Sequence, residues 1–530
     1  MLVGDISANN ARRYPAKRAL VDGDRVLTWS QVEDRARRVA SLLLHRGLSP
    51  GDRVAVIARN CIEWPEISFG LAKAGLIAVP VNIRLAPDEV THILDDSGAR
   101  AVIVHADQHD KFALELADLM VLTIGPDYES ALAAADPHPP RLDISPDDVA
   151  VILYTSGTTG RAKGVMHTHR ALLYQAADTN LVTEANRSDV MLATTPFFTA
   201  GGMVRTVSWL YLGQTMVIHQ RFDPHAVIDE IESSAITFTT FIPTMLHRTL
   251  AILENGPARD MSSLRRISYG SAPVPPGLAQ KAMDLLGCDL QQRYGLTECG
   301  GQATILTPQD HRDIVAGKTS TATSCGQETP MCSIRIVDGD GVTLPAGEIG
   351  EIVIESPANA IGYWNRPEQT AETFRPDGLR TGDLGYLDTE NYLHITGRRT
   401  ELIISGGFNV YPAEIERVIA HHDGVELVAV VGVPDPEWGE SPVAVVIPRN
   451  KKGTAADLDG LTAELTVLCR AELAGYKQPR RFEYRDAFPL GPAGKILKHE
   501  IANELSEAGT GDGLTPMASG PSKEGHDRSG

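Results

Sequence analysis

The sequence predicts an α/β protein with a large N-terminal domain of α/β subdomains, a small β-rich subdomain, and a small α+β C-terminal domain. Three observations support this prediction. Short runs of β-branched apolar residues alternate with helix-like stretches through the first part of the chain. After about residue 330 the pattern changes to shorter strands and turns. The length of 530 residues is also too great for a single hydrophobic core.

Residues 28–47 are expected to form an amphipathic helix. Gly47 stands where a helix C-cap glycine belongs. Five apolar residues recur at the spacing of one helical stripe: Val32, Ala36, Val39, Ala40 and Leu43. The strand-like runs around it are "DRVAVIA", "GLIAVPVN", "ARAVIVHA", "DVAVILY", "QTMVIHQ" and "AITFTTFIP". Their alternation with helical stretches is typical of buried sheets covered by helices.

In the last third of the chain the strand-like runs are shorter and are separated by turns. "CSIRIVDGDGVTLPAGEIGEIVI" reads as a β-rich subdomain, and "ELVAVVGVPDPEWGESPVAVVI" as part of a separate small domain. From about residue 509 the chain is rich in Gly, Ser and charge, so we expect a disordered tail.

Composition excludes several classes of protein. The net charge of −19 argues against a nucleic-acid partner or an anionic membrane surface. The six cysteines include no C-x-x-C pair, so neither a disulfide framework nor a zinc site is expected. "MLVGDISANNARRYP" lacks the pattern of a signal peptide, and no apolar run approaches the length of a membrane span. We therefore expect a cytoplasmic protein with no integral membrane segment.

The stretch "VILYTSGTTGRAKGVMH" concentrates small hydroxylic residues and glycine before a lysine. Because "DVAVILY" reads as a strand and "HRALLYQAADTN" as a helix, we expect a strand-to-helix loop that binds phosphate through backbone N–H groups. Lys163 is followed by Gly164, so this is not a Walker A motif. A flexible loop is the alternative. The candidate phosphate contacts are Thr155, Ser156, Gly157, Thr158, Thr159, Gly160 and Lys163.

Several motifs in order along nearly the whole chain carry a family resemblance. "YTSGTTGRAKGV" is similar to the signature of the adenylate-forming superfamily, the acyl-CoA synthetases among them, with Ala162 where proline is usual. The further motifs are "YGSAP", "RYGLTECG", "TGDLGYLD", "GRRTELIISGGFNVYPAEIE" and "GPAGKILK". The resemblance implies that ATP and a carboxylic acid give an acyl-adenylate and pyrophosphate, after which the thiol of coenzyme A takes the acyl group.

The resemblance also assigns roles to residues. Thr297 and Glu298 would be catalytic, with Glu298 binding Mg²⁺. Asp383 and Arg398 would hold the ribose. Lys495 would stabilise charge between the carboxylate and the α-phosphate. The remaining nucleotide contacts would be Gly270, Ser271, Ala272, Tyr294 and Gly295, and the acid would be bound by Phe198, Thr199 and Gly270.

The family's architecture implies a division of this chain into moving parts. Rotation of the small domain would bring first Lys495 and then the pantetheine-binding glycines Gly406 and Gly407 to the large domain. The expected parts are a large adenylation domain (1–397), a hinge (398–401) that contains Thr400, a small domain (402–508) and the tail (509–530).

Two departures leave the acid and the acceptor open. Thr400 stands where the family has Lys or Asp, and Thr199 where many relatives have a pocket histidine. His167 and His169, expected in the helix after the phosphate loop, are interpreted as structural. Arg205 is interpreted as solvated or structurally paired, and the alternative is that it pairs with a second carboxylate on a diacid.

We expect a ligase that joins a fatty or aryl acid to coenzyme A. The alternative is transfer of the acyl group to an amine, which the neutral residue at the hinge leaves open. A non-catalytic nucleotide-binding protein is disfavoured because Glu298 and Lys495 are both present, and a luciferase-like oxygenase rests on fold alone. A homodimer is a hypothesis for the assembly.

Overall fold

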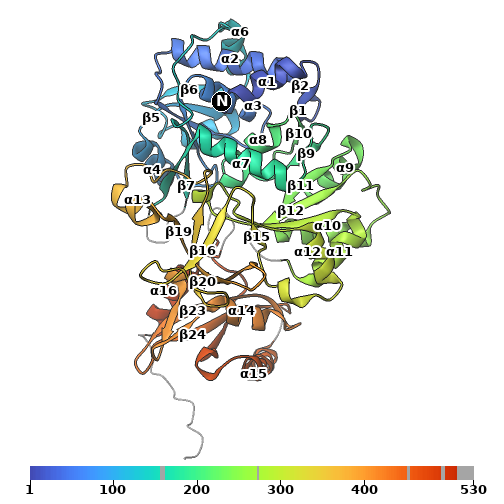
Figure 1. Cartoon of the computed structure of the whole chain (residues 1–530), viewed down its shortest axis with the longest axis vertical. Helices are drawn as coiled ribbons and strands as arrows, with labels where there is room; N and C mark the ends of the chain where they lie inside the picture. Colours follow the sequence, from blue (N-terminus) through green and yellow to red (C-terminus); the bar gives the residue numbers. More distant parts are fainter. Residues whose placement is uncertain (156–160, 271–273, 451–453, 491–495, 510–530) are drawn as a thin grey trace, which may run out of the picture. The chain divides into compact units, whose positions relative to one another are not determined.

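The computed structural model describes residues 1–155, 161–270, 274–450, 454–490 and 496–509. Its contacts divide the chain into two compact units, Met1–Thr400 and a second unit that begins at Glu401 (Figure 1). Mixed α/β architecture runs through the first unit, and the second combines a sheet with three longer helices. The predicted fold class is confirmed.

The first sheet of the large unit is mostly parallel and sits among its N-terminal helices. Its strands, in spatial order, are β6 (Met120–Ile124), β5 (Ala99–His105), β3 (Arg53–Ile57), β4 (Ile77–Pro80), β7 (Val149–Thr155) and β8 (Lys163–Thr168). The surrounding helices are α1 (Asp5–Arg13), α2 (Trp29–His45), α3 (Glu63–Lys73), α4 (Pro87–Ser97), α5 (Ala106–His109) and α6 (Pro126–Ala134). The amphipathic helix expected at 28–47 is α2, whose apolar stripe is fully buried, and Thr28 caps it.

The second sheet carries Gly270 and Tyr294 of the candidate site. Its strands, in spatial order, are β15 (Gln327–Glu328), β14 (Thr304–Leu306), β13 (Asp289–Tyr294), β12 (Arg266–Gly270), β11 (Phe238–Phe241), β9 (Val190–Ala193), β10 (Thr215–Ile218), β1 (Arg18–Asp22) and β2 (Arg25–Thr28). One face packs against α7 (His169–Val182) and α8 (Ala200–Leu210). The other packs against α9 (Pro224–Ser234), α10 (Pro243–Asn255) and α11 (Pro276–Leu286) (Figure 1). Helix α12 (Pro308–Val315) lies near α11.

The β-rich subdomain expected after about residue 330 is present as a third sheet. Its strands are β16 (Ser333–Val337), β17 (Gly350–Glu355), β18 (Phe374–Arg375), β19 (Gly378–Leu387) and β20 (Leu393–Arg398), with helix α13 (Pro367–Thr373) beside them.

The second unit has its own core on both faces of one sheet. The strands are β21 (Ile403–Ser405), β22 (Phe408–Val410), β23 (Val425–Asp435), β24 (Gly439–Pro448) and β25 (Arg481–Tyr484). Helices α14 (Pro412–Ala420) and α15 (Ala455–Glu472) cover one face, and α16 (Lys498–Gly509) packs on the other. The tail expected to be disordered lies, from residue 510, outside the described residues. Across the described helices of both units, none has the length and apolar character needed to span a bilayer.

Candidate active site

The phosphate-loop segment joins two strands of a hairpin. Residues 163–168 form β8, which pairs antiparallel with β7 so that Lys163 lies opposite Thr155. The expectation of a strand-to-helix loop is therefore wrong. Four of the six residues of "KGVMHT" are buried, the segment pairs with β7 along its whole length, and α7 begins only at His169. His167 accordingly lies in a strand and not in the helix where it was expected.

Lys163, Tyr363 and Glu298 form a line of contacts at the start of β8. The ammonium of Lys163 lies 5.3 Å from the centre of the Tyr363 ring, a cation–π distance. The Tyr363 hydroxyl donates to Oε1 of Glu298 at 2.9 Å. Burial and the Glu298 carboxylate raise the pKa of Tyr363, so the phenol keeps the proton that it donates. The contact fixes the direction of the Glu298 carboxylate.

Backbone pairing beside β8 places Tyr363. The amide of Trp364 donates to the Gly164 carbonyl at 2.7 Å, and that of Met166 to the Gly362 carbonyl at 2.9 Å. The amide of Ala360 donates to the carbonyl of Glu298 itself at 2.8 Å. The short segment 360–364 therefore joins the strand that carries Lys163 to the loop that carries Glu298.

Thr297 and Glu298 lie in a single helical turn, Thr297–Cys299, that ends at Gly300 in the left-handed conformation, with φ of 74°. The carbonyl of Thr297 accepts from the Gly300 amide at 3.0 Å and lies 2.9 Å from Nε2 of His167. Burial lowers the pKa of His167 to about 4, so the ring is neutral at pH 7. A neutral His167 with its proton on Nε2 donates to this carbonyl.

Tyr294, Asp383 and Arg398 form one hydrogen-bonded chain. The Tyr294 hydroxyl donates to Oδ2 of Asp383 at 2.7 Å. Nε of Arg398 lies 2.7 Å from Oδ1 of the same carboxylate. Asp383 and Arg398 are directly opposite each other in the β19–β20 pair, and Asp383 is buried. Burial and the neighbouring Asp383 raise the pKa of Tyr294 well above its usual value.

Gly270 and Gly295 lie where another backbone segment packs directly against them. A Cβ on Gly270 would lie 2.9 Å from the Arg293 carbonyl oxygen, and one on Gly295 would lie 2.5 Å from the Gln302 amide nitrogen. Gly270 ends β12 beside Arg293 of β13. A side chain at Gly270 would push β12 away from β13, which carries Tyr294, and one at Gly295 would push away the backbone at Gln302.

Phe198 and Thr199, two of the three residues expected to bind the acid, lie just before α8. The Thr199 hydroxyl donates to the Pro196 carbonyl at 2.8 Å and accepts from the Gly202 amide at 3.1 Å, so Thr199 is the N-cap of α8. Phe198 is buried in the core shared by α3, α7 and α8. Nη1 of Arg205, on the same helix, donates to the Thr240 hydroxyl at 2.8 Å.

In the second unit, Gly406 and Gly407 form the turn of the β21–β22 hairpin. Their φ angles of 57° and 81° are those of a turn that favours glycine at both positions. A Cβ on Gly406 would lie 2.5 Å from the Trp438 ring. Thr400 is the last residue of the first unit. Eight predicted site residues lie outside the described residues: Ser156, Gly157, Thr158, Thr159, Gly160, Ser271, Ala272 and Lys495.

The structure thus brings the predicted residues of the large unit into two groups, one around Glu298 and one around Asp383. Sequence reasoning missed Tyr363 and the contact of His167 with Thr297. The only local signal for Tyr363 is an aromatic pair in "AIGYWNRP", which has no helical or strand period. Both contacts join segments distant in sequence.

The donor set at Glu298 suits a magnesium ion that is shared with phosphates. Within the described ranges no group of three or more His, Cys, Asp or Glu side chains could hold a metal. A lone carboxylate oriented by Tyr363 fits Mg²⁺, which takes few protein carboxylates and completes its shell with substrate oxygens and water.

Comparison with known proteins gives matches over nearly the whole chain. The model of the family "AMP-binding enzyme" matches residues 7–364, and that of the "AMP-binding enzyme C-terminal domain" matches residues 414–495. These ranges together include most of the residues discussed above.

Relatives cover the chain almost end to end. A feruloyl-CoA synthase from Amycolatopsis sp is 38% identical over 94% of this chain and 98% of its own. The fatty acid–[acyl-carrier-protein] ligase ScoC from Streptomyces coeruleorubidus is 35% identical over 94% and 95%. The structure of o-succinylbenzoate CoA synthetase from Bacillus subtilis with its acyl-adenylate intermediate aligns with a TM-score of 0.82, at 29% identity, over 94% of this chain and 97% of that one.

Proposed function

This chain belongs to the AMP-binding enzymes, and from that membership we propose that it joins a fatty or aryl carboxylic acid to coenzyme A with ATP, in an AMP-forming reaction. The observation that carries the proposal is the chain of contacts Tyr294–Asp383–Arg398. It places Tyr294 and Arg398, both expected to contact the nucleotide, each within hydrogen-bond distance of Asp383, on strands from two different sheets.

The first half-reaction makes the acyl-adenylate. A carboxylate oxygen of the acid attacks the α-phosphorus of ATP, and the bond from that phosphorus to the bridging oxygen of pyrophosphate breaks. Thr297 would contact the α-phosphate, while Lys163 and the hydroxylic residues 155–160 would hold the departing phosphates. Mg²⁺, held by Glu298 and phosphate oxygens, would neutralise charge on the leaving group.

The second half-reaction makes the thioester. The sulfur of coenzyme A attacks the acyl carbon, loses its proton, and AMP departs with the bonding electrons of the acyl–oxygen bond. We assign Lys495 to the first half-reaction, and Gly406 and Gly407 to passage of the pantetheine arm in the second. Thr400 would be the residue about which the second unit turns.

Asp383 and Arg398 would bind the ribose in both half-reactions, with Tyr294 against the base. Gly270, Ser271, Ala272 and Gly295 would complete the nucleotide site. Phe198, Thr199 and Gly270 would lie along the acid. The close packing around Gly270, Gly295 and Phe198 is compatible with these roles.

Coenzyme A is favoured over an amine as the acceptor because the similar feruloyl-CoA synthase forms a thioester. The similar acyl-carrier-protein ligase also delivers its acyl group to a partner other than a free amine. We place the enzyme in the cytoplasm, where ATP and coenzyme A are both available, and a homodimer remains a hypothesis for its assembly.

The test is mass spectrometry of products. The full chain is incubated with Mg-ATP and a panel of fatty, aryl and heteroaryl acids, each with coenzyme A, with a simple amine, or with neither. Acyl-CoA formed only when coenzyme A is present supports the proposal and names the acid class. Amide with little thioester would overturn the acceptor and keep the adenylation step. No AMP with any acid would overturn both.

A further inference from the structure

Arg293 is a buried cation, and two nitrogens of its guanidinium lack hydrogen-bond partners. It lies in β13, is 4% exposed, and its Nε and Nη2 have no partner. The guanidinium lies 6.0 Å from the centre of the Phe238 ring. A buried, unpaired charge is costly, and an observed one calls for an explanation.

Arg205 supplies a second cation on the same side of the sheet. It comes from α8, which covers one face of the second sheet. Arg293, Gln291 and Ser268 point to this face, because they alternate along their strands with residues of the core on the opposite face. The single polar contact of Arg205 in the described chain is the neutral hydroxyl of Thr240. Burial lowers the pKa of Arg205 to about 10, so it is charged at pH 7.

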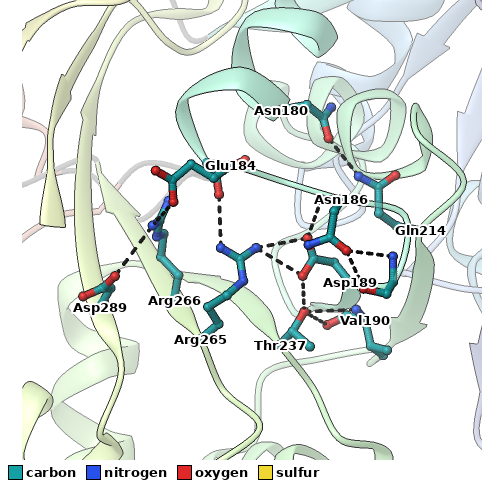
Figure 2. Close-up of polar contacts among 12 residues, drawn as sticks. Asn180, Glu184, Asn186, Asp189, Val190, Gln214, Thr237, Arg265, Arg266 and Asp289 are labelled. Atoms are coloured by element: carbon teal, nitrogen blue, oxygen red, sulfur yellow. Dashed lines mark hydrogen bonds and ion pairs between the residues drawn. The ribbon is translucent and has the colours of Figure 1, made fainter.

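The acidic groups nearby are already engaged. Figure 2 shows Arg266 held between Glu184 at 3.0 Å and Asp289 at 3.6 Å. Asp178, the one carboxylate that favours the charged form of Arg293, accepts from the Gln302 amide at 3.0 Å and the Met331 amide at 3.3 Å. In the described ranges neither Arg205 nor Arg293 forms an ion pair with a carboxylate.

Burial, followed by repulsion from Arg205 and Arg266, lowers the pKa of Arg293 well below its usual value. Repulsion between the two arginines therefore adds to the free-energy cost of burying their charges. Further polar atoms without partners lie on the same face, at the Ser268 hydroxyl and at Oε1 of Gln291. This face is polar and positively charged; the unpaired donors of Arg293 lack an acceptor, and Oε1 of Gln291 lacks a donor.

Arg293 lies close to residues that are expected to contact the nucleotide and the acid. It directly precedes Tyr294, which points to the other side of the strand and contacts Asp383. It also lies opposite Gly270, at the end of β12. An acid with one end at Thr297 would extend its other end along this face toward α8.

We propose that Arg205 and Arg293 together bind a second carboxylate, at the end of the acid remote from the one that is adenylated, so that the substrate is a dicarboxylic acid. This inference rests on the proposed function. Arginine suits the task because its planar fork matches a carboxylate, and the charge pair would form where water is excluded.

The experiment compares each dicarboxylic acid with its own half-methyl ester, which has nearly the same shape and lacks the second charge. Pyrophosphate release by the full chain with Mg-ATP is measured over a series of aliphatic and aromatic diacids of increasing length. We expect one diacid to exceed its half-ester by about 10²-fold or more in kcat/KM, most of it in KM, because an unmet buried charge rejects the analogue that lacks its partner.

Variants then assign the preference to the two arginines. Arg205→Met and Arg293→Met should each remove most of it, Arg205→Lys should retain part, and the exposed control Arg248→Met should leave it unchanged. Because Arg293→Met can affect folding, Arg205→Met is the decisive variant. A thermal-shift titration with the diacid and AMP reads binding without turnover.

The outcomes separate the two proposals. Equal kcat/KM for every diacid and its half-ester, or an undiminished preference in Arg205→Met, overturns the second-carboxylate site. Pyrophosphate release with monocarboxylic acids only also overturns it, and leaves the ligase function in place. Failure of every acid to release pyrophosphate overturns the ligase function and this inference together.

Discussion

The proposed nucleotide site and the proposed acid site of the large unit, hereafter the nucleotide end and the acid end, differ in how their polar side chains are paired. At the nucleotide end, Asp383 already accepts from Tyr294 and Arg398, and Glu298 from Tyr363. At the acid end, Arg293 has polar atoms with no partner, and Arg205 contacts only a hydroxyl among described residues. The first end is organised before any ligand binds, and the second depends on its ligand for completion.

This difference suits the two substrates. ATP is the same in every turnover, so a preformed site loses little entropy on binding it. The acid must be distinguished from many similar molecules, and an unpaired buried charge discriminates strongly because every ligand without the opposite charge leaves it unmet. The predictions below test whether the nucleotide end is as self-sufficient as its contacts indicate.

The largest effect is expected from Lys495→Ala. Loss of one charge that stabilises the transition state should slow adenylation by on the order of 10² or more, with nucleotide affinity nearly unchanged because the paired residues of the large unit remain. Pyrophosphate release gives the rate, and equilibrium binding of ATP gives the affinity. Lys281→Ala is the surface control. An unchanged rate would remove Lys495 from the mechanism, and a large loss of affinity would show that the nucleotide end is not self-sufficient.

The next effect concerns His167, which supports the loop of the nucleotide end. Its folded-state pKa of about 4 lies below the usual 6.5, so the unfolded chain takes up the proton first as pH falls. Its contribution to stability is therefore complete above pH 6.5 and lost toward pH 4, by about 1.5 kcal/mol between pH 6.5 and pH 5.

Denaturant unfolding of the wild type and His167→Gln at several pH values measures this loss. Glutamine keeps an N–H donor for the Thr297 carbonyl and does not titrate, so its stability should fall less steeply. The exposed His138→Gln should follow the wild type. Parallel curves for wild type and His167→Gln would show that the histidine is not held neutral.

A smaller effect is expected from Asp383→Ala, which removes the acceptor shared by Tyr294 and Arg398. Apparent ATP affinity should fall roughly tenfold, because a charged hydrogen-bond acceptor for the ribose is lost and the Tyr294 hydroxyl loses its acceptor. Asp383→Asn should lie between, and the exposed Asp340→Ala should match the wild type. Normal ATP affinity in Asp383→Ala would refute the ribose assignment.

Tyr294→Phe should have the smallest effect. It removes only the hydroxyl that donates to Asp383, so ATP affinity should fall by about two- to fivefold and the free energy of unfolding by about 1 kcal/mol. Tyr174→Phe, at an exposed position, is the control. A loss as large as that of Asp383→Ala would mean that the hydroxyl orients the carboxylate and is not merely a second partner for it.

Local patterns in the sequence predict much of this architecture. The stripe from Val32 to Leu43 and the run "DVAVILY" are visible because helices and strands have fixed periods. Only the family resemblance predicts that Asp383, Arg398 and Tyr294 lie in one nucleotide site, and it does not predict their direct contacts with one another. The strand period of two residues and the helix period of 3.6 residues relate only positions within one element, so they give no sign that residues 294, 383 and 398 lie together.

The features that sequence reasoning missed all depend on long-range pairing. β8 is a strand because β7 and segment 360–364 supply its hydrogen bonds, although helix α7 begins directly after it at His169. Two guanidinium nitrogens of Arg293 have no hydrogen-bond partner because no acceptor from another segment lies beside them. No sequence motif shows such a missing neighbour. Arg205 could be named from the sequence, but its lack of an acidic partner could not.

The hydroxyl of Thr199 closes the N-terminus of α8, the helix that carries Arg205. In a laboratory-evolution experiment, position 199 would therefore couple two traits: a substitution chosen for a new acid would also remove a cap worth about 1 kcal/mol to the helix. Successful lineages should acquire a compensating change in the first turn of α8 before, or together with, a new residue at 199. The order of such changes would show which substitutions evolution can reach from this sequence.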